Sequence, residues 1–396
     1  MTEELSQVSE IPGLYGDFKM EEVILQWIWA EQSFLQEDLS TICGKKVKVL
    51  QRGEWNRAGE GPDFLNGRIQ LDGDIFDGDI EVHFRSSDWW RHGHQKDVNF
   101  EGVVLQVTLF TSEQDARDGR THGGRSVPTL NLLPYLYRGV EEYAEEWMVS
   151  KLAGYLPTQS HILEGVRQHT APAKVSARKR WEAKCRYARK RMESGNWEQA
   201  VHQWFMEVLG YRRNRLSMAR VALRYPFEYW QIGEVVPSEV YLEEKGWVGS
   251  GSRPSNHPKK RLWQYASLWK KNPQWINELK NLRIQDSSKG KPCTRASLGV
   301  YDLSRKVREN IWMSVFSASR AHTLWLDCCL PMLQTEHSED LFLHWYHWPT
   351  GDCPHGYREI SHSLGWVKGG RTDPFSNGHF QAILQKLTEI PNPLHT

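Results

Sequence analysis

The residues best suited to chemistry lie between positions 54 and 97, in the segment EWNRAGEGPDFLNGRIQLDGDIFDGDIEVHFRSSDWWRHGHQKD. Asp63 begins one β-favourable run, and Glu81 and His83 stand two residues apart in the next run. Because side chains alternate along a strand, we expect Glu81 and His83 to share one face. If the runs pair through the DGD turn at 72–74, Asp63 lies beside Glu81. Two carboxylates at the end of a twisted sheet predict a site for Mg²⁺ or Mn²⁺ that also admits water and a phosphate.

A second group of candidate metal ligands follows directly. His92 and His94 are separated by one residue, so two imidazoles on an extended loop could hold one ion. Together with His83 or Glu81 they would form a three-ligand site with an open position, which is typical of catalytic Zn²⁺. The alternative is that both histidines take part only in the hydrogen bonds of an Asp-rich loop.

Structural roles compete with the functional interpretation of the acidic residues as well. Asp63 can cap a turn, and Glu81 can pair with Arg68 or Arg85 across the sheet. Glu31 lies on the apolar face of the first predicted helix. It is either a third acidic residue that reaches the site or a residue at the surface boundary of the helix, and we favour the boundary.

The elements that must position these residues are indicated by hydrophobic periodicity. Residues 20–35 repeat apolar side chains at helical spacing. Strands are predicted at 47–51, 64–71, 75–84 and 103–110, and the last run, VVLQVTLF, is apolar enough for a central strand covered on both faces. We therefore expect an α/β N-terminal domain at 15–115 with a small mixed sheet, followed by a linker at 116–130.

The remainder, residues 131–396, is predicted to be a mainly α-helical, basic domain. Helices are expected at 174–192, 197–209, 216–224, 258–271 and, with a break, 303–333. Trp181, Trp204 and Trp269 occupy core spacing, and the pair Cys328 and Cys329 lies in an apolar run that predicts burial.

Charge is distributed unevenly along the chain. Residues 1–150 contain 27 acidic and 14 basic side chains, a net charge of −13, whereas the remainder contains 22 and 36, a net charge of +14. The helix at 174–192 carries nine basic residues and one acidic residue. We expect it to bind the phosphate backbone of DNA or RNA, through Arg178, Lys179, Arg180, Arg186, Arg189, Lys190 and Arg191. The alternatives are a solvated helix face and mutual neutralisation of the two halves.

The order of elements and the acidic residues resemble the PD-(D/E)xK nuclease superfamily. Pro62 and Asp63 match the first part of its motif, and Glu81 matches the second acidic position. The resemblance implies a restriction-endonuclease-like topology in which Asp63 and Glu81 hold the metal. His83 stands where that superfamily has Lys, so it would act as general base or join the metal ligands.

A longer resemblance links the chain to an uncharacterised bacterial family with a domain of unknown function. It rests on GPDFLNGRI, GDIEVH and SSDWWRHGHQKD, and on RPSNHPKKRLWQYASL at 253–268. In the last string, Pro258 suits the first turn of a helix and Asn256 a nearby cap, with phosphate contact as the second interpretation. This resemblance implies the architecture and no activity.

Composition limits the remaining choices. There is no run of 18 apolar residues, the N-terminus MTEELSQVSE is acidic, and six cysteines are too few for a disulfide framework. We expect a cytoplasmic, metal-dependent enzyme that hydrolyses phosphodiester bonds in nucleic acid. The alternatives are a catalytically degenerate nucleic-acid-binding or scaffold protein, and a Zn²⁺ or Mn²⁺ hydrolase of a small molecule.

Overall fold

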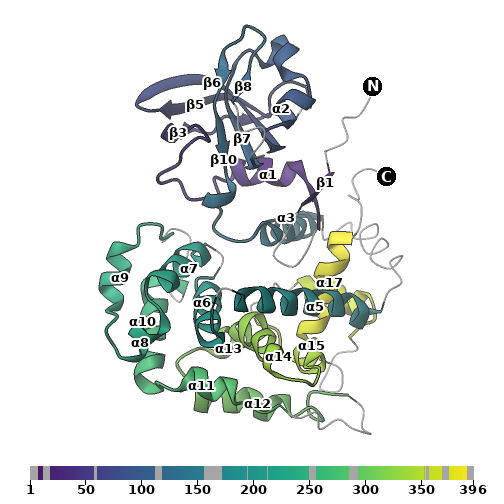
Figure 1. Ribbon diagram of the computed structural model, residues 1–396. Helices are drawn as coiled ribbons and strands as arrows, with labels where there is room; N and C mark the ends of the chain where they lie inside the picture. The colour runs from purple at the N-terminus through teal and green to yellow at the C-terminus, as the bar shows by residue number, and fades with distance from the viewer. Residues whose placement is uncertain are drawn as a thin grey trace. The chain divides into compact units, whose positions relative to one another are not determined.

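The computed structural model forms two compact units (Figure 1). The first comprises Met1–Gly13 and Asp17–Ala144, and the second Leu14–Gly16 and Glu145–Thr396. The structure describes residues 8–11, 18–57, 60–111, 118–155, 172–193, 195–211, 213–248, 256–284, 293–351, 353, 356–367 and 374–389.

A mixed sheet is the framework of the first unit. Its strands run in the order β10-β7-β6-β5-β3, with β4 beside β5. The pairs β10/β7 and β7/β6 are parallel, and β6/β5, β5/β3 and β5/β4 are antiparallel. The strands are β3 (Val47–Gln51), β4 (Glu54–Trp55), β5 (Phe64–Leu71), β6 (Asp74–Arg85), β7 (Val103–Phe110) and β10 (Thr129–Asn131).

The hairpin of β5 and β6 sets the register of the site, as the DGD turn predicts. Leu71 pairs with Asp74, and Asp72 and Gly73 between them both have positive φ, 50° and 105°. Positive φ at both central residues matches the right-handed twist of a hairpin. A bulge between Phe64 and Gly67 then shifts the register, and Phe64 pairs with Ile80. Asp63 therefore lies next to Glu81.

The apolar core of the first unit lies between the sheet and helix α1 (Glu22–Ala30). This helix is shorter than the predicted 20–35, packs against β6, and buries Leu25, Ile28 and Trp29. Every residue of β7 except the last is buried, as expected of a central strand. The smaller elements are β1 (Val8–Ile11), β2 (Phe18–Glu21), α2 (Asp88–Arg91), η1 (His94–Lys96), η2 (Val98–Phe100) and η3 (Leu133–Tyr135).

The segment expected to be a linker, 116–130, contributes strands to the first unit over its described part. They are β8 (Gly119–Arg120), β9 (Ser126–Val127) and the start of β10. Val127 and Leu130 are fully buried. Pairing in short strands provides hydrogen-bond partners for the backbone of this segment, and the polar composition of the segment does not predict this pairing. Helix α3 (Val140–Tyr155) follows.

The second unit is built from helices, so the predicted fold class, a mixed-sheet α/β region followed by a mainly helical region, is confirmed. Its core contains Trp181, Trp204, Trp269, Cys328 and Cys329, as predicted. The helices are α5 (Ala173–Met192), α6 (Trp197–Leu209), α7 (Arg215–Arg224), α8 (Phe227–Gln231), α9 (Pro237–Glu243), α10 (Pro258–Lys271), α11 (Trp275–Lys280), α12 (Val300–Lys306), α13 (Ala318–Leu324), α14 (Leu330–Glu336), α15 (Phe342–His347), α16 (Gly356–Ser363) and α17 (Asn377–Glu389), with π-helical turns η6 (Val307–Ile311) and η7 (Trp325–Cys329).

Within the residues that the structure describes, none of the helices combines the length and apolar character needed to cross a membrane.

Candidate metal centre

Three potential ligand atoms converge on one point at the C-terminal end of β6. Glu81 and His83 share a face of this strand, as their spacing predicts, and both are buried, 6% and 1% exposed. His83 Nε2 and His94 Nε2 each lie 3.3 Å from Glu81 Oε1. The two imidazole nitrogens lie 3.2 Å from each other. Two histidines and a carboxylate thus form a nearly equilateral triangle.

The size of this triangle fits a bound metal ion. Ligand atoms at about 2.0–2.1 Å from a tetrahedral ion lie roughly 3.3–3.4 Å apart. The three edges of the triangle, 3.2, 3.3 and 3.3 Å, agree with that spacing. Imidazole nitrogens with one carboxylate oxygen suit Zn²⁺ or Mn²⁺ better than Mg²⁺, which prefers oxygen. The residues present therefore fit a divalent transition metal.

His92 extends the group to a third imidazole. One ligand atom each from His83, His92 and His94 lie within 4.8 Å of one another. His92 ends the short helix α2, Gly93 turns the chain with a φ of 80°, and His94 begins η1. The His94 ring stacks on Phe100, with ring centroids 3.8 Å apart. The tight turn at Gly93 therefore directs both histidines of the His-x-His motif toward β6.

Asp63 supports this group through its backbone and its carboxylate. Its backbone N–H donates to Glu81 Oε2 at 3.1 Å, which leaves Glu81 Oε1 for the histidines. Its own carboxylate accepts from Val82 N at 2.9 Å and from Gln26 Nε2 at 2.6 Å. Trp55 Nε1 in turn donates to Gln26 Oε1 at 3.3 Å. Asp63 thus lies beside Glu81, as predicted, and connects β6 to α1.

A residue of β7, supported by one of β10, contacts the Nδ1 side of the His83 ring, opposite Nε2. Gln106 Nε2 lies 3.0 Å from His83 Nδ1, and Thr129 Oγ1 donates to Gln106 Oε1 at 3.0 Å. In this orientation the amide donates to Nδ1, so the proton of the neutral ring is on Nε2. Half a turn of the amide brings Oε1 to Nδ1–H, which leaves the Nε2 lone pair for a metal ion.

Acidic side chains from two further elements surround the group. Glu22, at the start of α1, accepts from Phe84 N at 3.3 Å, and Asp88 accepts from Arg85 N at 2.9 Å. Burial, together with the negative charges of Glu81 and Asp88, raises the pKa of Glu22 to about 7, although the positive charge of His83 acts in the opposite direction. A buried carboxyl next to other carboxylates is the environment in which a bound cation is favourable.

The pKa values of the ligand residues follow from burial and mutual contact. Burial raises the pKa of Glu81, but hydrogen bonds to His83 and His94 outweigh it and lower the value to about 2. Burial lowers the pKa of His83, but the bond to Glu81 and nearby negative charges raise it overall. Burial and the charges of His83 and His94 lower the pKa of His92 to about 4. His92 is therefore neutral, and competent as a ligand, at neutral pH.

Other residues considered from the sequence lie elsewhere. Glu31 is exposed at the end of α1, which agrees with the boundary position that we favoured. Arg68 pairs with Asp77 at 2.9 Å. Sequence reasoning missed Glu22, Gln26 and Gln106. Glu22 and Gln26 lie in or next to the apolar stripe of α1 and belong to no recognisable motif. Gln106 could have been found, because it is the one amide inside the apolar run VVLQVTLF.

A comparison with protein families places the chain in a known group. The family described as "Protein of unknown function (DUF2851)" matches residues 22–240, more than half of the chain. The chain belongs to the DUF2851 family. This confirms the resemblance to an uncharacterised family. The matched segment begins at Glu22 and contains every residue of the candidate metal centre. No curated protein and no solved structure matches the chain.

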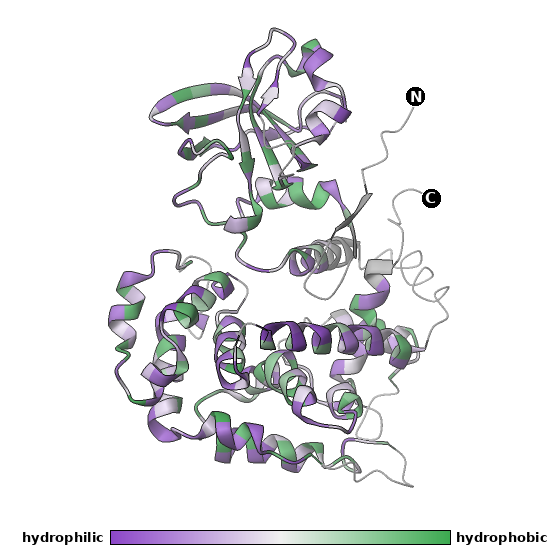
Figure 2. Cartoon of the chain, viewed as in Figure 1, coloured by the Kyte–Doolittle hydropathy of each residue, from purple (hydrophilic) through white to green (hydrophobic). Residues whose placement is uncertain are grey.

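The DUF2851 match also includes helix α5, which is largely hydrophilic (Figure 2). Three of its seven predicted phosphate-binding residues contact acidic side chains of the same unit: Arg178 meets Asp340, Arg180 meets Glu145, and Arg191 meets Glu207. The other four are exposed: Lys179, Arg186, Arg189 and Lys190. The four exposed cations follow one side of the helix.

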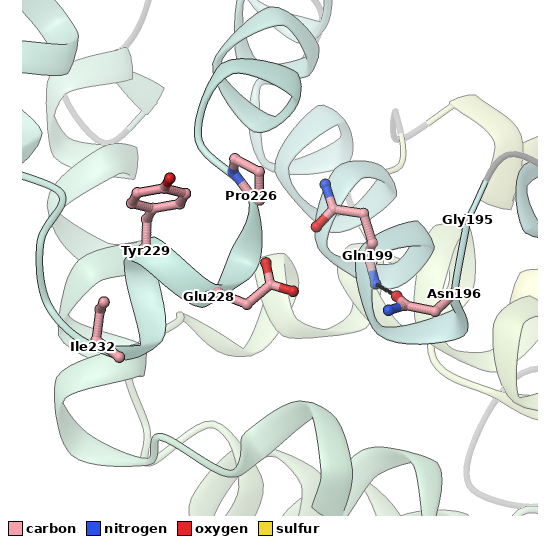
Figure 3. Close-up of a pocket in the computed structure, with 7 residues that line it drawn as sticks. All are labelled: Gly195, Asn196, Gln199, Pro226, Glu228, Tyr229 and Ile232. Atoms are coloured by element: carbon pink, nitrogen blue, oxygen red, sulfur yellow. Dashed lines mark hydrogen bonds between the residues drawn. The ribbon is translucent and has the colours of Figure 1, made fainter.

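The matched segment further contains an open pocket in the second unit (Figure 3). Its volume is about 720 Å³, and Pro226, Tyr229 and Ile232 of the α7–α8 region face Asn196 and Gln199 of α6 across it. Asn196 caps α6 by accepting from Gln199 N at 2.8 Å. The polar groups at one wall thus serve the helix end, and the pocket contains no cluster of ionisable side chains comparable with the metal centre.

Proposed function

We propose that the first unit is a metal-dependent hydrolase and that its substrate is a phosphodiester bond of nucleic acid. The observation that carries the proposal is the convergence of Glu81 Oε1, His83 Nε2 and His94 Nε2 at mutual distances of 3.2–3.3 Å. His92 would be a nearby imidazole able to take the place of one of these three ligands. Three protein ligands would hold one ion and leave the fourth position for water, which is the composition of catalytic rather than structural metal sites.

The residues of the site have separate roles in this proposal. When bound, the ion would lower the pKa of a water molecule and offset the charge that develops on the phosphate. Glu81, His83 and His94 hold the ion, and Asp63 fixes the Glu81 carboxylate through its backbone N–H. Gln106 orients the His83 ring from the side opposite the ligands. Glu22 adds a buried carboxyl group that interacts with the charges of His83 and Glu81 and so increases the affinity of the site for a cation.

The choice of ion follows from the ligand atoms. Two or three imidazoles favour Mn²⁺ or Zn²⁺. The predicted pairing of Asp63 with Glu81 suggested Mg²⁺ or Mn²⁺. In the structure, however, both carboxylate oxygens of Asp63 accept hydrogen bonds, one from Val82 N and one from Gln26 Nε2. We therefore assign Asp63 to positioning and propose Mn²⁺ or Zn²⁺ as the metal.

Positive side chains favour an anionic substrate. Arg57 is exposed and stacks on Trp55, with its guanidinium 4.5 Å from the ring centroid, and Trp55 is linked through Gln26 to Asp63. The exposed cations of α5 in the second unit, including Arg189 and Lys190, offer further phosphate contacts. Contacts of this type bind the nucleic-acid backbone without reading its sequence.

The three imidazoles also favour a second candidate, hydrolysis of a small molecule at a Zn²⁺ or Mn²⁺ centre. In that case His83, His92 and His94 hold the metal and the cations of α5 do not contact the substrate. The degenerate nucleic-acid-binding or scaffold protein differs from both candidates, because it would bind nucleic acid with no metal requirement.

The test combines metal analysis with a cleavage assay on the full chain. We expect about one Mn²⁺ or Zn²⁺ per chain and metal-dependent cleavage of labelled DNA or RNA, both lost in Glu81→Gln and His83→Asn. Asp77→Asn is the matched control, because Asp77 is exposed on the same strand. Stoichiometric metal without nuclease activity would transfer the proposal to a small-molecule substrate. Nucleic-acid binding without metal would contradict both hydrolase proposals.

A further inference from the structure

The open pocket of the second unit combines an aromatic ring, a carboxylate and two amide groups. Its volume of about 720 Å³ lies in the range of small-molecule binding sites. Pro226, Tyr229 and Ile232 form its apolar side, and Figure 3 shows the Glu228 side chain extending from α8 toward Gln199. An apolar wall with a few polar groups is the usual composition of a site for a small organic ligand.

The amide groups of α6 present hydrogen-bond donors to the pocket. Gln199 Oε1 accepts from Phe227 N at 3.2 Å, and Asn196 Oδ1 accepts from Gln199 N at 2.8 Å. Backbone N–H groups thus engage both amide oxygens, and within the described part of the chain neither amide nitrogen donates to another residue. The bond from Phe227 also brings the first turn of α8, and with it Glu228, against α6. Donors of α6 and an acceptor of α8 therefore border the same space.

Glu228 and Tyr229 offer the other two contacts to a ligand. The Glu228 side chain is exposed, and none of the described residues pairs with its carboxylate, whereas Glu198 nearby on α6 is paired with Lys280 at 2.8 Å. Tyr229 is 49% exposed, and its ring packs against no other described aromatic ring. A carboxylate only accepts hydrogen bonds, and an aromatic face stacks on a planar ring. The ligand that fits is therefore planar, with donors for the carboxylate and an acceptor for the amides.

Nucleobases are planar ligands that carry donors and acceptors together on one edge. Guanine places two donors, N1–H and the N2 amino group, side by side, with the O6 carbonyl next to them. The two donors match the two oxygens of one carboxylate, and the carbonyl matches an amide N–H. Adenine and cytosine have a ring acceptor beside their amino group, and a carboxylate repels that acceptor. Guanine is therefore the base that this arrangement of groups favours.

We propose that the pocket between α6 and α8 binds a guanine base. The base stacks on Tyr229, its N1–H and N2 amino groups donate to the Glu228 carboxylate, and its O6 accepts from an amide of α6. The site lies in the second unit and does not rest on the metal centre or on the proposed function. The same base can belong to a free nucleotide or to a nucleic-acid strand.

The experiment is isothermal titration calorimetry of the full chain with guanosine monophosphate and with adenosine monophosphate. We expect guanosine monophosphate to bind roughly 10–100-fold more tightly, because only guanine donates twice to the carboxylate. Glu228→Gln should abolish this preference, since an amide offers a single acceptor oxygen. Glu239→Gln removes the same charge at an exposed position on α9, so it is the matched control and should retain the preference.

Two variants of Tyr229 test the stacking contact. Tyr229→Leu should weaken the binding of guanosine monophosphate about tenfold, whereas Tyr229→Phe should retain it, because its ring preserves the stacking face. A single-stranded oligonucleotide containing guanine is then compared with one that has adenine at the same positions. Tighter binding of the guanine strand than of the mononucleotide would identify a base within a strand, and weaker or equal binding would identify a free nucleotide.

Three outcomes would overturn the proposal: equal affinity for the two mononucleotides, no binding of either, or a guanine preference that persists in Glu228→Gln. Metal content and cleavage activity are separate measurements, so failure of this proposal is distinguishable from failure of the proposed function.

Discussion

Gln106 is the single buried amide that positions the ring of His83 in the candidate metal centre. It is fully buried in β7 among apolar residues, where an amide is costly unless its hydrogen bonds are satisfied. Its partners are His83 Nδ1 on one side and Thr129 Oγ1 on the other. A residue that orients a ligand ring from behind changes metal affinity without touching the metal.

We expect Gln106→Leu to weaken metal binding by roughly 10–100-fold, because the His83 ring loses the partner that fixes its orientation. Gln106→Glu should retain binding, since its carboxylate can accept Nδ1–H. The measurement is a competition titration with a chelating metal indicator. Thr108→Val is the control, because it changes a buried hydroxyl two residues away while preserving shape. Equal affinity of Gln106→Leu and the wild type would exclude a positioning role.

Residue spacing predicted part of this site. Alternation along β6 placed Glu81 and His83 on one face, and the DGD turn placed Asp63 beside Glu81. The use of the Asp63 oxygens was not predictable, because Val82 N and Gln26 reach them only through the bulge in β5 and the packing of α1. Local periodicity thus identifies neighbouring residues, whereas tertiary packing decides which of their atoms face the candidate metal site.

At the scale of elements, the close approach of β6 to β7 positions the ligand end of β6. A Cβ atom on Gly78 would lie 2.4 Å from Gly102 O and 2.5 Å from Val104 Cγ1. The parallel register also shifts between Asp79 and Ile80, just before Glu81. Only a glycine at this position permits the two backbones to approach and the shift to form.

We expect Gly78→Ala to lower the free energy of unfolding of the first unit by about 1–3 kcal/mol, because backbone must move to admit the methyl group. Metal affinity should fall as well, since Glu81 follows three residues later. Chemical denaturation and metal titration measure the two effects. Gly195→Ala is the control, since its Cβ would meet nothing within 4 Å. Unchanged stability of Gly78→Ala would show that β6 and β7 separate without cost.

Helix and strand positions were largely predictable because apolar residues repeat at helical or strand spacing in these elements. β3, β5 and β7 and helices α6 and α10 have the predicted bounds. The short strands β8 and β9 were not predictable, because two-residue strands carry no periodic signal and form only where the rest of the sheet offers a partner. The expected function of α5 depends on which cations face outward, and this too is decided by packing.

At the scale of the whole molecule, the helical unit should respond to mild acid through its buried histidines. His202 on α6 is fully buried. Its Nδ1 lies 2.6 Å from Tyr265 Oη, and its Nε2 donates to Tyr225 O at 3.0 Å. Burial lowers its pKa to about 4. Burial and two arginines likewise lower the pKa of His322 to about 4. Both rings are neutral in the folded protein at pH 6.

In the unfolded chain these histidines titrate at an ordinary pKa of about 6.5, so between that value and about 4 the unfolded state binds more protons. The free energy of unfolding therefore falls as pH falls, by up to about 1.4 kcal/mol per pH unit for each histidine. We expect the urea midpoint of the helical unit, followed by tryptophan fluorescence, to be lower at pH 5 than at pH 7. His202→Gln should reduce this difference, since an amide keeps a donor for Tyr225 O and does not titrate. His362→Gln, at an exposed position on α16, should leave it unchanged. The same pH dependence in wild type and His202→Gln would mean that the buried ring is protonated without cost.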